Sequence, residues 1–167
     1  MSLPLAAAGA IVLALLELSV TPYLKIAGLK PDLLLIAVTA IASFYGLERA
    51  IGWAFVGGLM LDVLSAGPYR PLGATAFTLL LVAGLAAAMT RALPSGRIVV
   101  TVALVFILGV LYQLLILFFV SLRGVSAADP LGTAVPIALL DALLAIPVAL
   151  VAFLAVRRFR AQEGLGW

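Results

Sequence analysis

Long apolar runs, separated by short polar or proline-containing segments, make up almost all of this chain. A transmembrane helix needs about 20 predominantly apolar residues. The pattern therefore predicts an all-α membrane protein in which residues 1–167 form a single integral membrane domain. Six transmembrane helices are expected, at residues 3–21, 32–47, 50–65, 72–90, 98–122 and 133–156, followed by a short tail at 157–167. Pro147 should kink the last helix, because proline removes a backbone hydrogen bond.

Composition supports the membrane assignment and removes several kinds of chemistry. The chain is 66% hydrophobic and 10% charged, whereas soluble domains carry about 25% charged residues. Cysteine and histidine are absent, which excludes disulfides, thiol catalysis and histidine general bases, and removes the usual zinc and haem ligands. The net charge of +3 comes from basic residues in short loops, not from one patch that could bind nucleic acid. We expect no enzymatic activity, cofactor, metal site or nucleic-acid partner.

Basic residues predict the orientation of the helices, since cytoplasmic loops of membrane proteins carry an excess of Lys and Arg. With the N-terminus inside, six basic residues fall on the cytoplasmic side: Arg49, Arg91, Arg97, Arg157, Arg158 and Arg160. Four fall on the outer side: Lys25, Lys30, Arg70 and Arg123. We therefore expect a multi-pass protein with both termini in the cytoplasm. The arginines of the tail are also expected to contact anionic membrane lipids.

The stretch from Trp53 to Gly73 combines a small-residue stripe with one carboxylate. Ala50, Ala54, Gly58 and Asp62 recur every four residues, and Gly57 adjoins the stripe. Such spacing places side chains on one helix face, where small residues allow a neighbouring backbone to approach closely. An aspartate beside them has to face protein or a water-filled cavity, because hydrocarbon disfavours an ionised side chain. The stretch predicts a packing seam with a polar anchor, ended by the Gly67-Pro68 turn.

Three more polar side chains lie within expected helices, at Glu17, Gln113 and Asp141. The carboxylates of Glu17, Asp62 and Asp141 all fall in the outer half of the bundle. One interpretation is a polar cavity, or a partner-docking site, that opens outward. The other is that the carboxylates anchor helix ends, by pairing with outer-loop cations or reaching the lipid headgroups. Gln113 is expected to form a hydrogen bond between helices.

The order of motifs resembles that of a known family. The sequence contains P-D-L-L-L from Pro31, then G-L-E-R, then G-G-L-x-L-D-V-L-S-A-G-P-x-x-P-L-G ending at Gly73. This pattern resembles that of the rod shape-determining protein MreD family. The matching positions are Pro31, Gly57, Gly58, Asp62, Gly67, Pro68, Leu72 and Gly73. They lie in the first half of the chain, and the turn before Leu72 is slightly longer than the family pattern.

The resemblance implies a non-enzymatic scaffold in the bacterial inner membrane, within the machinery that directs lateral cell-wall synthesis in rod-shaped cells. The implied partner is the single-span protein MreC. The peptidoglycan glycosyltransferase–transpeptidase pair and MreB filaments are implied as indirect partners. A fold similar to that of the substrate-binding subunits of energy-coupling-factor vitamin transporters is also implied. In this hypothesis, the seam and Asp62 hold the fold, while a lipid-facing groove receives the partner's helix.

The alternative is that the protein is itself a substrate-binding subunit of an energy-coupling-factor vitamin transporter. Ala6, Ala10 and Ala14 have the A-x-x-x-A spacing with which such subunits engage their transport module. An alanine-rich helix also produces this spacing by chance. A vitamin carrier should have aromatic and polar side chains in its outer loops, and the loops here offer few. A channel would need a continuous polar path, which one glutamine does not supply.

Overall fold

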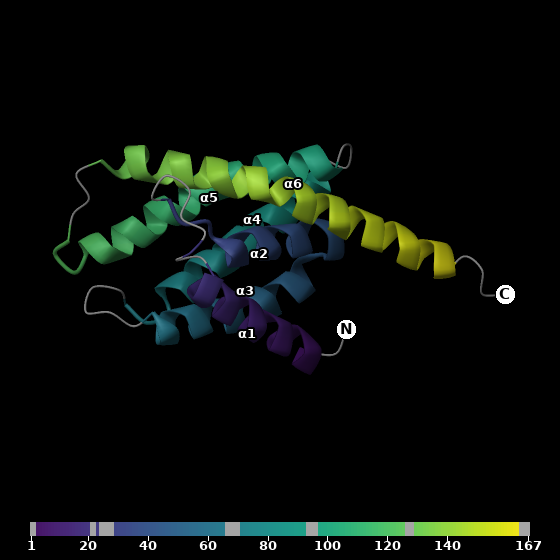
Figure 1. Ribbon diagram of the computed structural model, residues 1–167, viewed down its shortest axis with the longest axis horizontal. Coiled ribbons are helices and arrows are strands. Elements are labelled where there is room, and N and C mark those ends of the chain that lie inside the picture. The colour runs from purple at the N-terminus through teal and green to yellow at the C-terminus, as the bar shows by residue number, and fades with distance from the viewer. Residues whose placement is uncertain are drawn as a thin grey trace.

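The computed structural model describes residues 3–20, 23, 29–65, 71–92, 97–125 and 129–163. These residues form six α-helices (Figure 1). Their bounds are α1 Leu3–Val20, α2 Leu33–Tyr45, α3 Leu47–Leu64, α4 Ala74–Ala92, α5 Arg97–Ser121 and α6 Pro130–Glu163. Three helical segments are long and apolar enough to cross a membrane: Ala74–Ala92, Ile98–Ser121 and Pro130–Arg158. The predicted class, an all-α membrane protein with six helices, is confirmed.

The shortest helix, α2, occupies the centre of the bundle. It contacts each of the other five helices, and Figure 1 shows it in the middle of the bundle. Leu34, Leu35 and Val38 are among its fully buried side chains. With 13 residues, α2 is about 20 Å long at 1.5 Å per residue, which is less than the roughly 30 Å of the hydrocarbon core. At least one end of this central helix therefore lies at membrane depth.

The small-residue face of α3 is buried, as its four-residue spacing predicts. Ala50, Ala54 and Asp62 are almost inaccessible to solvent, and Gly58 is buried with them. A Cβ atom added at Gly58 would lie 2.5 Å from the Cα of Ala76 in α4. Glycine is therefore required at this crossing, because any side chain would meet backbone atoms. The neighbouring Gly57 instead accommodates Leu34 of α2, so the two glycines bring two different helices close to α3.

The last helix is longer than the sequence pattern predicts. It begins at Pro130 and continues to Glu163, beyond the expected range of 133–156 at both ends. Pro136 and Pro147 lie inside it, and Figure 1 shows that its course bends between the green and yellow parts. Its first part pairs with α5, whereas α6 and α1 make no contact with each other within the described residues. This separation leaves one side of α2 uncovered.

Candidate functional site

Two carboxylates from other helices hold the beginning of α2. Glu17 of α1 accepts a hydrogen bond from the backbone N–H of Leu34, with a distance of 2.8 Å between the nitrogen and Oε2. Asp141 of α6 accepts one from the backbone N–H of Asp32, also at 2.8 Å. The first N–H groups of any helix lack partners within the helix, and hydrocarbon supplies none. These carboxylates therefore supply acceptors for N–H groups at the start of the central helix.

Asp32 precedes α2, but its side chain does not form a hydrogen bond that caps its own helix. Its Oδ2 instead accepts a hydrogen bond from the Nε2 of Gln113 in α5. The start of α2 is thereby connected to α1, α5 and α6 through polar groups. We refer to Glu17, Asp32, Gln113 and Asp141 as the α2 polar cluster. It combines Glu17, Gln113 and Asp141, the candidates from the first, fifth and sixth helices, in one place.

Asp141 is the most deeply enclosed member of the α2 polar cluster, with an exposed fraction of 0%. Its Oδ1 accepts the Asp32 N–H, while its Oδ2 is buried with no hydrogen-bond partner among the described residues. A buried carboxylate beside a second carboxylate is electrostatically unfavourable. Only the acceptor at Oδ1 is engaged with the neighbouring helix.

We expect Asp141→Asn to be at least as stable as the parent protein at neutral pH. The amide oxygen can still accept the Asp32 N–H, and the amide cannot place a negative charge at this buried site. Asp141→Leu should be less stable by about 1–3 kcal/mol, because the Asp32 N–H then lacks an acceptor. Thermal unfolding in mild detergent, followed by size-exclusion chromatography, measures both effects. Equal destabilisation by Asn and Leu would show that the charge of Asp141, not its acceptor oxygen, supports the fold.

Asp62 of α3 holds the beginning of α4 in the same way. It is 2% exposed and accepts hydrogen bonds from three backbone N–H groups, those of Gly73, Thr75 and Ala76. The nitrogen–oxygen distances lie between 2.9 and 3.3 Å. Gly73 has a φ of +91°, a conformation that favours glycine over all other residues. That turn directs the Gly73 N–H to the carboxylate, so Asp62 and Gly73 act together.

The candidate residues thus fall into two groups, one at each helix start. The second group contains Gly58, Asp62 and Gly73, while Ala54 and Gly57 pack in the core beside it. Gly67 and Pro68 lie outside the described residues. Sequence reasoning did not identify Asp32 as a member of the first group, although the Pro31-Asp32 start of the second helix was a possible signal. Glu17, Asp62 and Asp141 bind helix starts. No three His, Cys, Asp or Glu residues in the described part of the chain are placed to hold a metal ion.

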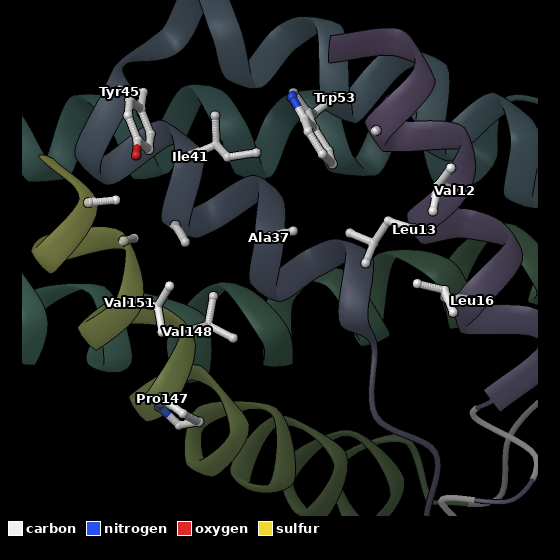
Figure 2. A pocket seen from close by; sticks show the side chains of 14 residues that line it. Val12, Leu13, Leu16, Ala37, Ile41, Tyr45, Trp53, Pro147, Val148 and Val151 are labelled. Atoms are coloured by element: carbon white, nitrogen blue, oxygen red, sulfur yellow. The ribbon is translucent and has the colours of Figure 1, made fainter. Parts of the chain in front are cut away.

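A separate apolar groove of about 570 Å³ runs along the uncovered side of α2. Figure 2 shows Ala37, Ile41 and Tyr45 of α2 between the side chains of α1 and α6. Trp53 of α3 also lines the groove. None of Glu17, Asp62 and Asp141 does so. The interpretation that the carboxylates form an outward polar cavity is therefore not supported by this groove, because its lining is aliphatic and aromatic.

Comparison with known protein families assigns the chain to one of them. The sequence model of one family, described as rod shape-determining protein MreD, matches residues 5–159 of the 167-residue chain. No curated protein gives a significant match. No solved structure does so either, so the expected similarity to energy-coupling-factor subunits has no support from known folds. The family match covers α2 to α5 entirely and most of α1 and α6, including both helix-start groups and the groove. This chain therefore belongs to the rod shape-determining protein MreD family.

Proposed function

We propose that this membrane protein is a non-enzymatic scaffold of the bacterial cell-elongation machinery, which binds MreC and helps to organise lateral peptidoglycan synthesis. The observation that carries the proposal is the family match over residues 5–159. The family consists of rod shape-determining proteins and is not a known enzyme family. In this role the protein acts through binding, with the peptidoglycan glycosyltransferase–transpeptidase pair and MreB as indirect partners.

The arrangement of polar and apolar groups supports a scaffold. The carboxylates described above bind backbone N–H groups of neighbouring helices, which fixes the relative positions of α1, α2 and α6, and of α3 and α4. Large apolar side chains cover the outside, among them Phe55 of α3 and Phe77 of α4, each more than half exposed. A membrane-spanning partner helix can pack on such a surface without bringing polar groups into hydrocarbon. A rigid inside and an apolar outside suit a protein that docks other helices.

The proposed location is the inner membrane, with both termini in the cytoplasm. Figure 1 shows the beginning of α1 and the end of α6 on the same side of the bundle. Arg157 and Arg158 are exposed near that end of α6. The side of a membrane protein that carries an excess of Arg tends to face the cytoplasm, which supports this orientation.

Co-purification tests the proposal. We expect the protein, extracted from native membranes in mild detergent, to recover MreC in near-equal amount, as measured by mass spectrometry of proteins and small molecules together. In rod-shaped cells depleted of their own MreD, expression of this chain together with its cognate MreC should restore rod shape, measured as cell length over width. A matched strain expressing an unrelated six-helix membrane protein is the control and should remain round.

Two results would contradict the proposal. One is recovery of a vitamin-like molecule together with ATPase subunits, which would identify a transporter subunit. The other is recovery of the folded protein without MreC from membranes that contain MreC. The second result is meaningful only for a well-folded sample, so a single symmetric chromatography peak is required first.

A further inference from the structure

The groove beside α2 has two walls that do not touch each other. Its floor is α2, and the walls are α1 and α6, which make no mutual contact within the described residues. On α1 the lining residues follow a spacing of three and four, from Gly9 to Leu16, and on α6 the same spacing runs from Val148 to Ala155. Each wall is therefore one helix face, and the groove runs between two helices (Figure 2).

The groove is suited to a hydrocarbon chain. Its lining contains no charged side chain, and its volume of about 570 Å³ lies within the range of roughly 300–1,000 Å³ found for ligand sites. Val12 of α1 and Val151 of α6 are 56% and 66% exposed, so the walls continue into the lipid-facing surface. An occupant can enter from the bilayer without crossing water.

Cations lie at one end of the groove. Tyr45, the last residue of α2, lines the groove, and the guanidinium of Arg49 lies over its ring, with 5.5 Å between Cζ and the ring centroid. On α6, Arg158 comes three residues after Ala155 and seven after Val151, so it continues the wall toward the same end. The site thus combines an apolar groove with two positive charges at one end.

We propose that this groove binds an anionic phospholipid, with an acyl chain along α2 and the phosphate at Arg49 and Arg158. Charge decides between this occupant and a protein helix. A partner's transmembrane helix carries its own Lys and Arg on the cytoplasmic side, and these would meet the arginines with like charge. A phosphate meets them with opposite charge, and basic sites between helices on that side are known to bind anionic headgroups. The bound lipid separates α1 from α6 and completes the covering of α2. This inference does not depend on MreC binding.

The first test measures headgroup preference. The purified protein in mild detergent receives equal amounts of phosphatidylglycerol and phosphatidylcholine, and native mass spectrometry counts the retained lipids. We expect retention of phosphatidylglycerol over phosphatidylcholine. The double variant Arg49→Gln/Arg158→Gln should reduce this preference about fivefold for each arginine, which corresponds to about 1 kcal/mol per basic residue near an anionic surface. Arg91→Gln, at the end of α4 and outside the groove, is the matched control and should leave the preference unchanged.

The second test fills the slot. Ala37 lies on the floor of the groove, so Ala37→Phe should reduce retention of both lipids, whereas Ala88→Phe on the exposed side of α4 should not. Equal retention of the two lipids by the parent, or unchanged retention in Ala37→Phe, would overturn the proposal. The proposal would also be overturned if the groove held a protein helix, from a second copy of the chain or from a co-purified protein. In that case Ala37→Phe would release this helix and not lipid. If Ala37→Phe does not fold, the arginine variants decide the question alone.

Discussion

Asp62→Leu is expected to abolish most of the folded protein recovered from membranes. The leucine cannot accept hydrogen bonds, so the N–H groups of Gly73, Thr75 and Ala76 lose the acceptor that Asp62 supplies. Leaving a buried donor unsatisfied costs about 1–3 kcal/mol, and three are affected at one helix start. We therefore expect a loss of about 3 kcal/mol or more, which is a large part of the stability of a typical domain. Fluorescence-detected size-exclusion chromatography of a tagged protein measures the folded fraction.

Two variants make the Asp62 test specific. Asp62→Asn retains one acceptor oxygen and should give a yield between those of the parent and the Leu variant. Asp129→Ala is the matched control, since Asp129 also accepts a backbone N–H at a helix start, that of Gly132, but on an exposed surface. Water can replace that acceptor, so its removal should have little effect. If Asp62→Leu folds like the parent but fails to bind MreC, Asp62 belongs to the partner interface instead.

Gly58→Ala is expected to lower the thermal stability strongly, although it adds a single methyl group. The new Cβ would lie 2.5 Å from Cα and 2.8 Å from the backbone N of Ala76, and backbone atoms cannot rotate away. The helices α3 and α4 must therefore separate. Inserting excess volume into a packed core typically costs about 1–3 kcal/mol. Separation also lengthens the 3.3 Å hydrogen bond from the Ala76 N–H to Asp62, so one methyl group disturbs both the packing and the polar anchor.

The control for Gly58 lies in the same helix. A Cβ atom at Gly52 would meet no other atom within 4 Å, so Gly52→Ala should be neutral or slightly stabilising, because alanine favours helix over glycine by up to about 1 kcal/mol. Thermal unfolding of the two variants side by side isolates the effect of the helix crossing. Equal unfolding temperatures for Gly58→Ala and the parent would show that α3 and α4 can separate without loss. The double variant with Asp62→Leu should show less than additive destabilisation, since both changes act on one junction.

The sequence predicted the helices and the buried face of α3 because both follow from local regularities. Apolar runs of sufficient length define membrane helices, and a four-residue repeat such as Ala50, Ala54, Gly58 and Asp62 necessarily shares one face. Sequence reasoning also named Glu17 and Asp141 as structural or partner-interaction candidates, since a carboxylate at membrane depth is energetically costly. These predictions required no knowledge of which helices are neighbours.

The partners of the carboxylates could not be predicted for the opposite reason. Glu17 binds the N–H of Leu34, and Asp62 binds N–H groups at the start of α4. Every residue except proline has such a backbone group. The sequence therefore does not indicate which backbone N–H groups these carboxylates bind. The only charged partners that it suggested were the cations of the outer loops. The central position of α2 was also hidden, although its short length and lack of charge are consistent with it. The groove depends on the separation of α1 from α6, which no local pattern records.

The cap that α6 provides for α2 links the order of synthesis to the order of folding. Asp141 comes 109 residues after Asp32, whose N–H it accepts. The ribosome must therefore make most of the chain before this acceptor exists. Until then, the Asp32 N–H at the start of α2 lacks the acceptor that Asp141 supplies. A chain interrupted before α6 retains that defect at its centre. The start of α2 is therefore complete only in a chain that includes α6, and an unfinished chain differs from a finished one at the core as well as in length.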